Sequence, residues 1–411
     1  MLQNVTAAPV RRSLEFGIYR DGDNNLDAIQ ESTLSQALRT SRTDSRIEFT
    51  VEDTTRLRAD GDAVVSGALH TEQYTIADGD VSRVHLVRAH EMSSEANLAR
   101  FVAHTLGNAQ ASGAQTTWLD LVDHGGGDGG GLETRDGRVM SMPDIAKAIS
   151  DGVTLHAHEH PEDAGRGVDG VVANQCLMDT MGFADALSHA GVKYLAASPE
   201  TMLAPGVPSG VAHAIASHAH APDAMAKAIV NDVMRTKYDA GELDFGPAAA
   251  FDVLDLDPEK IARAERSVKQ LNDDVAAEAR ASGVRRAVHN DARAIDGMAR
   301  FPEATSDMPW RADRPAIAFY EKLASDARMS DKVRADARAA AEAVRSLVLS
   351  HRESDDFKAF GGSDYSDAVG PTVHLPTSRR QIDPWASAGV TETDNSFYQA
   401  VDEDAMTRVT T

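Results

Sequence analysis

The sequence predicts an α/β fold in which a mostly parallel sheet lies between helices, followed by a mainly helical C-terminal region. Short runs rich in β-branched or aromatic residues alternate with longer helix-like segments over about the first 200 residues, a pattern typical of parallel βαβ units. Beyond them, Ala, Arg, Glu and Asp recur at helical spacing. A hydrophobic content of 42% with 26% charged residues is ordinary for a globular chain.

The elements of the first part follow from these patterns. Six strands are expected, at residues 13–19, 46–52, 83–88, 116–122, 170–174 and 192–198. Helices are expected at residues 26–38, 94–111, 143–151 and 177–190, and residues 73–79 are expected to form a hairpin-like strand near the sheet edge. Such an order of strands and helices predicts a sheet covered by helices on both faces.

The second part changes character near residue 220. Helices are expected at residues 222–240, 257–282, 314–327 and 330–351, with strands at 248–256 and 369–376 and an irregular polar tail. We therefore expect a catalytic α/β domain over residues 1–220. Residues 221–411 are expected to form a helical region whose additional strands pack on that domain.

Charge and hydropathy narrow the classes of partner. The formal net charge of −23 argues against nucleic acid and against anionic membrane surfaces, which require a basic face. No apolar run approaches the ~18–20 residues that span a bilayer. The N-terminal segment has no signal-peptide core, because Arg11 and Arg12 interrupt its apolar run. A cytoplasmic location is the simplest expectation, although a secreted protein without its leader would look the same.

The first segment that suggests chemistry follows the strand at 116–122. That strand runs into Asp123 and His124, and six of the next seven residues are glycine. In an open α/β sheet, ligands bind beyond the carboxyl ends of the strands. A histidine placed there, beside backbone N–H groups that no side chain covers, can act as an acid or a base. Gly125, Gly127 and Gly130 fit the G-x-G-x-x-G pattern of dinucleotide-binding loops. That motif requires a helix directly after the glycines, and no helix is expected here. A structural histidine in a flexible loop is the alternative.

The second such segment contains Cys176, the one cysteine of the chain. The strand before it ends at Asn174, and a helix is expected to begin at about the cysteine. A helix N-terminus stabilises a thiolate, and a nearby imidazole lowers the thiol pKa further. A single cysteine excludes an intramolecular disulfide and a multi-thiolate metal site. The alternative is a buried, unreactive thiol.

Together these segments resemble the clostripain family of cysteine peptidases, which is related to caspases, gingipains and legumains. Five short segments match the landmarks of that family in order, and the later FDVLDL (251–256) and GPTVHLP (370–376) resemble its C-terminal landmarks. The five are DGDNNL at Asp21–Leu26, DHG at Asp123–Gly125, SMPDI at Ser141–Ile145, NQCLM at Asn174–Met178 and SPET at Ser198–Thr201. The resemblance covers residues 13 to 376.

The resemblance implies a caspase-like α/β/α sandwich and a cysteine endopeptidase. Cys176 would be the nucleophile that forms a thioester with the acyl part of the substrate, and His124 would act as the acid and base. The backbone N–H groups of Gly125 and Cys176 would hold the oxyanion. The partner would be a peptide or protein substrate. Oligomeric state does not follow from the resemblance.

The resemblance implies no required cofactor, although some relatives use calcium. Asp21, Asp23 and Asn25 carry clustered oxygens that suit a hard cation such as Ca²⁺. The same residues could instead cap the helix that is expected to follow. The sequence alone does not decide between calcium binding and helix capping.

Substrate specificity is where the chain departs from its relatives. The family has an aspartate two residues before the cysteine, at the base of a pocket that selects Arg or Lys, and this chain has Asn174. An amide brings no charge, so a basic preference would need a carboxylate from Asp123, Asp179 or Glu200. Relatives are also cut between the two catalytic segments. Arg166, in a loop-like stretch, is the site expected here for any self-processing.

A second function class remains open from the sequence. A caspase-fold protein could serve as a binding scaffold, or could process only itself. The retention of both catalytic residues favours the peptidase, since a scaffold has no chemical need for them. The dyad predicts rapid alkylation of Cys176 at neutral pH, whereas a structural thiol would react slowly.

Overall fold

The computed structural model describes most of the chain. It covers residues 12–56, 69–87, 91–134, 136–203, 205–239, 244–281, 284–298, 309–354, 365–378, 381 and 395–411. Within this part of the chain, no helix combines the length and the apolar character that crossing a bilayer requires.

A nine-stranded sheet forms the centre of the molecule, in the order β12-β10-β7-β6-β5-β1-β2-β3-β4. Its five middle strands are parallel, as the alternation of strands and helices predicts. They are β1 (Leu14–Asp21), β2 (Ile47–Arg56), β5 (Thr116–Val122), β6 (Gly170–Asn174) and β7 (Tyr194–Ala197). The ranges expected for β5 and β6 are those observed.

One edge of the sheet is a hairpin. β3 (Leu69–Ala77) runs antiparallel to β2 and pairs with β4 (Asp80–Val87). Asp78 and Gly79 join the two strands with φ values of 53° and 82°, the left-handed pair that a two-residue hairpin turn requires. The hairpin-like strand expected near the sheet edge is confirmed.

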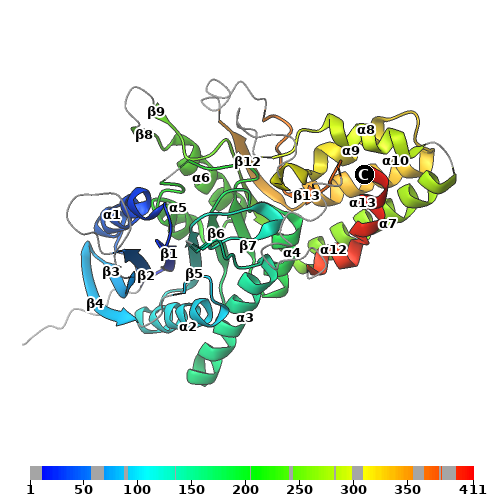
Figure 1. The fold of residues 1–411 in the computed structure, drawn as a ribbon. Coiled ribbons are helices and arrows are strands. Elements are labelled where there is room, and N and C mark those ends of the chain that lie inside the picture. The colour runs from blue at the N-terminus through cyan, green and yellow to red at the C-terminus, as the bar shows by residue number, and fades with distance from the viewer. Residues whose placement is uncertain are drawn as a thin grey trace, which may run out of the picture.

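Helices cover both faces of the sheet, and the buried apolar side chains form one large cluster on each side (Figure 1). On one face lie α2 (Glu95–Ser112), α3 (Met142–Glu159) and α4 (Met181–His189). On the other lie α1 (Asp27–Thr43), α5 (Val211–His218) and α6 (Pro222–Arg235). The predicted α/β/α sandwich is therefore confirmed.

The chain after residue 220 contributes to the sheet and also forms a helical lobe (Figure 1). β10 (Ala250–Asp255) and β12 (Val348–Glu353) extend the sheet antiparallel beyond β7. The lobe contains α7 (Pro258–Ala281), α8 (Val284–Ala294), α9 (Ala316–Ser325) and α10 (Asp331–Arg345). Strands from both sides of residue 220 thus share one sheet, and the division into two domains there stays a prediction.

Smaller elements complete the fold. β11 (Asp313–Pro315) and β13 (Thr372–His374) form a two-stranded antiparallel sheet, and β8 (Tyr238–Asp239) pairs with β9 (Asp244–Phe245). Short 3₁₀ turns among the described residues include η1 (Gly127–Gly129), η2 (Pro161–Asp163) and η3 (Pro309–Ala312). The chain ends in α12 (Ser396–Val401) and α13 (Glu403–Thr410).

Two expectations for the C-terminal region are wrong in detail. The helix expected to reach residue 351 ends at Arg345, because the following residues pair with β10 as β12. The tail expected to be irregular contains α12 and α13, whose apolar residues Phe397 and Val401 are buried. In both cases long-range contacts decide the structure, and local sequence patterns do not report them.

Candidate active site

The two predicted catalytic segments meet at the carboxyl edge of the parallel strands. β5 and β6 are neighbours in register, with Val122 opposite Asn174. His124 and Cys176 each lie two residues beyond that pair, so the sheet itself brings them to the same edge. Both line one small cavity of about 110 Å³. The carboxyl-edge argument made from the sequence thus holds for this pair of residues.

His124 is oriented by a side chain from the turn that follows the neighbouring strand β1. Its Nε2 lies 2.8 Å from the Oδ1 of Asn25, a contact in which Nε2–H donates to the amide oxygen. That tautomer leaves Nδ1 with its lone pair, available as a base. Burial lowers the pKa of His124, and the nearby Glu133 offsets part of the effect. The imidazole is therefore neutral at neutral pH.

The contact of Asn25 with His124 does not follow from the sequence, which suggests calcium binding or helix capping for this residue. β1 lies beside β5 in the sheet, so the residues after β1 reach the same edge as His124. The signal that could have found it is the position of the DGDNNL segment directly after a buried strand. Asn24, next to it, donates from Nδ2 to Oδ1 of Asp123 and so fixes the residue before the histidine.

Cys176 lies in a turn rather than at the start of a helix, which corrects the sequence-based expectation. α4 begins only at Met181, where the Thr180 hydroxyl caps it by accepting a hydrogen bond from the N–H of Phe183. The helix dipole effect is confined to the first turn, so it does not reach the sulfur. The chain needs the intervening residues to cross from the sheet edge to the helix layer.

The surroundings of the sulfur keep Cys176 as a thiol. Burial raises its pKa, and the nearby Glu200 raises it further. The N–H of Met202, which donates to Sγ over 3.2 Å, acts in the opposite direction. The low-pKa thiolate expected from a helix start is therefore wrong for this structure. A neutral thiol faces the same cavity as a neutral imidazole.

The glycine loop after His124 approaches the backbone of Cys176 closely. A Cβ atom on Gly125 would lie 2.3 Å from the carbonyl oxygen of Cys176, so only glycine fits there. Gly125 forms an antiparallel bridge with Gly131. The bonds of that bridge run from Gly126 N–H to Gly130 O and from Leu132 N–H to His124 O. This pattern turns the N–H of Gly125 outward from the bridge, as an oxyanion donor requires.

The candidate specificity residues do not all reach the cavity. Asn174 and Asp123 line it, whereas Asp179 and Glu200 do not. Asp179 is buried next to Asp252, and burial together with that neighbour holds its pKa well above the usual range. Glu200 is buried, and its Oε2 accepts a hydrogen bond from the N–H of Thr201.

Asn174 is held by two hydrogen bonds to one residue of the loop after β7. Its Nδ2 donates to the carbonyl oxygen of Val207 over 3.2 Å, and its Oδ1 accepts from the N–H of Val207 over 2.8 Å. The neighbouring Gly206 has φ +83°, and a Cβ there would lie 2.0 Å from Oδ1. The amide thus fixes one wall of the cavity as well as lining it.

The remaining acid of the cavity is Asp123, and its surroundings disfavour its charged form. Asp123 is buried, and burial and the nearby Asp21 raise its pKa well above the usual range. The hydrogen bond from Asn24 opposes that shift without reversing it. A carboxyl group whose charged form is disfavoured in this way contributes less negative charge to the cavity.

The candidate calcium ligands take part in other contacts. Oδ1 of Asp21 accepts a hydrogen bond from the N–H of Asp23 over 2.9 Å, and Asn25 contacts His124. Among the described residues, one group of three or more His, Cys, Asp and Glu side chains could hold a metal, and it contains neither Asp21 nor Asp23. Calcium binding by the DGDNNL turn stays a prediction.

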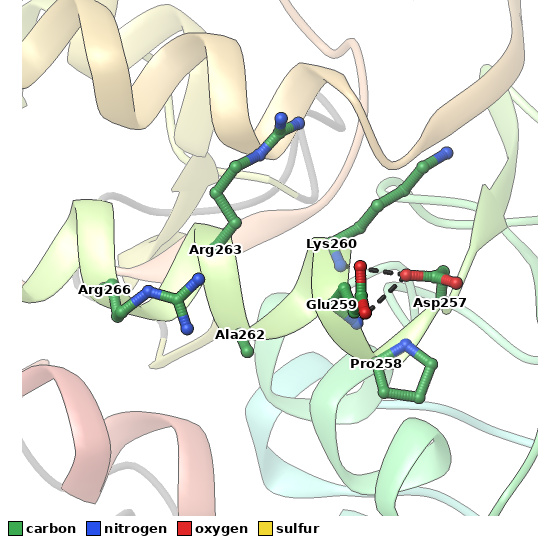
Figure 2. Close-up of a pocket in the computed structure, with 7 residues that line it drawn as sticks. All are labelled: Asp257, Pro258, Glu259, Lys260, Ala262, Arg263 and Arg266. Atoms are coloured by element: carbon green, nitrogen blue, oxygen red, sulfur yellow. Dashed lines mark hydrogen bonds between the residues drawn. The ribbon is translucent and has the colours of Figure 1, made fainter.

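A wider hollow lies at the start of α7 (Figure 2). The carboxylate of Asp257 there accepts hydrogen bonds from the N–H groups of Glu259 and Lys260, over 3.0 and 3.1 Å. These bonds satisfy the first turn of the helix. Lys260 donates to Asp255 and Arg263 donates to Ser346. Because the polar groups are engaged with their neighbours, we assign no chemistry to this hollow.

Comparison with known proteins identifies the fold. No family model matches the chain, and no curated protein sequence does. An inactive zymogen C11 protease from Parabacteroides distasonis superimposes with a TM-score of 0.62 at 13% identity, over 96% of this chain and 99% of that one. A secreted C11 cysteine protease from Bacteroides thetaiotaomicron gives 0.59 at 13% identity, over 95% and 100%.

A complex of a secreted C11 cysteine protease from Bacteroides thetaiotaomicron with an irreversible peptide inhibitor gives a TM-score of 0.61 at 14% identity, over 96% and 99%. The structural neighbours of this chain are therefore C11 proteases along nearly its whole length. At such low identity the likeness establishes the fold, and the chemistry has to be argued from the residues.

Proposed function

We propose that this protein is a cysteine endopeptidase whose nucleophile is Cys176 and whose acid and base is His124. The observation that carries the proposal is the placement of both side chains on one cavity at the carboxyl edge of the sheet. The comparison with C11 proteases supports it at the level of the fold.

The reaction follows from the protonation states. A substrate peptide in the cavity would bring its carbonyl carbon to Sγ, and His124 would accept the thiol proton as the S–C bond forms. The N–H groups of Gly125 and Cys176 would donate to the oxyanion. The imidazolium would then protonate the leaving amine as the C–N bond breaks, leaving a thioester. Water, deprotonated by His124, would hydrolyse that thioester and restore the thiol.

The direct test is turnover of a positional peptide library by wild type and by Cys176→Ala. We expect cleavage by the wild type and none by the variant, with equal thermal unfolding of the two proteins. Equal cleavage by both would end the proposal. A wild type that binds peptides without cutting them, or that cuts only its own chain, would instead favour the scaffold or self-processing alternative.

Any preference at the substrate position before the cleaved bond would depend on Asn174 and Asp123, the polar side chains of the cavity wall. Asn174 is uncharged, and burial disfavours the charged form of Asp123. We therefore propose that the enzyme accepts uncharged as well as basic side chains at this position. Matched substrates carrying Arg, Lys, Gln or Leu would measure this. A preference for Arg above about 100-fold, or roughly 2.7 kcal/mol, would contradict it.

Self-processing would take place between the two catalytic segments. Arg166, favoured by the sequence, bonds to Asp163 and to the carbonyl oxygen of Ala114. The guanidinium of Arg138 also forms ion pairs, with Asp136 and Glu91, so exposure distinguishes the two sites. Its side chain is 18% exposed, whereas that of Arg138 is 58% exposed. We propose Arg138 as the site of any self-cleavage. Mass spectrometry of wild type and Arg138→Ala would test this, and a fragment ending at Arg166 would contradict it.

A further inference from the structure

A second group of reactive side chains lies outside the cavity of the dyad. Asp128, Asp313 and His374 each offer a ligand atom, and these atoms all lie within 4.8 Å of one another. Among the described residues, no other group of at least three His, Cys, Asp and Glu side chains meets that condition. The group combines two carboxylates with one imidazole, which is a common ligand set for transition metals.

The three residues come from distant segments of the chain. Asp128 lies in η1, within the glycine loop that follows His124. Asp313 opens β11 and His374 ends β13, and they are direct cross-strand partners in that small sheet. The fold therefore assembles the group from a loop of the catalytic sheet and from the C-terminal region.

The group is almost completely buried. Asp128, Asp313 and His374 are only 9%, 2% and 1% exposed. Asp313 forms an ion pair with His374. Buried carboxylates are stable when a proton or a cation compensates them, and a divalent cation bound between the three side chains would act on both carboxylates at once.

The geometry fits a shared ion. Nδ1 of His374 lies 3.2 Å from Oδ1 of Asp313. Two ligands on one tetrahedral Zn²⁺ lie about 3.4 Å apart when each bond is about 2.1 Å. The N–H of Asp128 lies 3.5 Å from Oδ2 of Asp313, and a Cβ on Gly127 would lie 2.1 Å from that oxygen. A glycine with φ +62° is thus what lets the loop close over the group.

A tyrosine that is not one of the three candidate ligands also contacts this group. The Tyr398 hydroxyl, on α12, donates to Oδ2 of Asp128. Metal-bound carboxylates are commonly held by such a hydrogen bond, which fixes their orientation. The three ligand residues and this tyrosine together form a closed, polar site.

We propose that Asp128, Asp313 and His374 bind one divalent transition-metal ion of the Zn²⁺ type. Ca²⁺ and Mg²⁺ fit less well, because they prefer sites made entirely of oxygen with six or more ligands. The ion would tie the loop that follows His124 to β11 and β13. β13 also contacts the segment after Cys176, since the N–H of Thr372 donates to the carbonyl oxygen of Asp179. The bound ion would thereby stabilise the segments that follow His124 and Cys176. It does not depend on the proposed peptidase activity.

The test is best done in the Cys176→Ala chain, because a thiol and an imidazole at the dyad could themselves bind zinc. That protein is loaded with ZnCl₂, dialysed and analysed for metal content. We expect about one equivalent of zinc per chain and a rise in the unfolding temperature relative to the chelator-treated protein. Replacing Zn²⁺ by Co²⁺ should give the visible absorption of a low-symmetry site.

Variants locate the ion. Asp313→Asn and His374→Gln, each in the Cys176→Ala chain, should lower the retained zinc at least tenfold and remove the thermal shift. The control is His351→Gln, whose imidazole contacts Asp252 over 2.9 Å without belonging to a group of three metal-ligand side chains. It should retain the ion.

Two results would overturn the proposal. One is the absence of retained metal, cobalt absorption and thermal shift in the folded Cys176→Ala chain, a result that needs no further variant. It would mean that the group is a hydrogen-bonded triad which shares protons. The other is retention of one equivalent in both ligand variants, which would place the ion elsewhere.

Discussion

The ends of β5 and β6 lie side by side, yet the chain holds them in different ways. The histidine after β5 is held by a side chain, since Asn25 from the β1 side contacts its imidazole. The cysteine after β6 is held by backbone from the opposite side, since the N–H of Met202 donates to its sulfur. The site is thus positioned by two loops that flank the strand pair. A change in either loop can disturb one member of the dyad and leave the other in place.

The electrostatics of the two ends also differ. Burial disfavours the charged form of both groups, but it lowers the pKa of His124 and raises the pKa of Cys176. The two shifts together favour a neutral pair over a thiolate–imidazolium pair. In the proposed reaction, the proton transfer between them would then occur when the substrate reacts.

The largest expected effect comes from His124→Ala. Loss of the general base should lower kcat by about 10²–10⁴-fold. The alkylation rate of Cys176 at neutral pH should change little, because a neutral imidazole does not stabilise a thiolate. Peptidase assays and iodoacetamide kinetics on the same preparation measure both. A large drop in the alkylation rate would show that the resting pair is ionic and would remove the contrast between the two ends.

The sequence was a good guide to this edge of the sheet. Residues 116–122 and 170–174 were predicted as strands with their observed bounds, because buried parallel strands are short, continuous apolar runs. The residues that follow them were therefore placed at one edge. Asn25 and Met202 could not be assigned their roles, since each acts through a contact across more than 25 positions of sequence.

The start of α4 shows where local patterns fail. The apolar run after Cys176 favoured a helix from residue 177, whereas the helix begins at Met181 behind its Thr180 cap. A threonine followed by an apolar segment is a signal for the start of a helix, and Thr180 carries that signal here. The expected stabilisation of the Cys176 thiolate required the helix to begin at the cysteine, and the helix begins at Met181 instead.

The second prediction concerns the pH dependence of Cys176 alkylation. Only the thiolate reacts, and burial raises the pKa of this thiol. The rate should therefore be lower at pH 7 than that of a free cysteine in a short peptide. This replaces the rapid alkylation expected from the sequence, so slow alkylation at neutral pH does not by itself indicate a structural thiol. It should rise about tenfold for each pH unit and level off only above the usual thiol range. Stopped-flow alkylation across pH measures this. A plateau that begins below pH 7 would show a thiolate, as first expected from the sequence.

The third prediction concerns Asn174→Asp. The new carboxylate should raise kcat/KM for Arg or Lys substrates by about tenfold if it reaches the cation. It should also lower the free energy of unfolding by about 1–3 kcal/mol, because it cannot donate to the carbonyl oxygen of Val207. Kinetics on matched Arg and Gln substrates, with denaturant unfolding, measure both effects.

The control for Asn174→Asp is Asp179→Asn, which changes an acid that does not line the cavity. Its Arg-to-Gln preference should equal that of the wild type. If Asn174→Asp leaves that preference unchanged as well, the pocket base implied by the family resemblance does not lie at this residue.

The smallest effect tests the contact that the sequence could not reveal. Asn25→Ala removes the amide oxygen that accepts from Nε2–H of His124 over 2.8 Å. A single hydrogen bond of this kind is worth about 0.5–1.5 kcal/mol, so kcat should fall by up to about tenfold. KM should change little, since Asn25 acts through the histidine. Asn25→Asp keeps an oxygen acceptor but adds a charge, so it should retain turnover and raise the pKa on the acidic limb of the kcat–pH profile. An unchanged kcat in Asn25→Ala would mean that the glycine loop alone orients His124, and that both ends of the dyad are held by backbone.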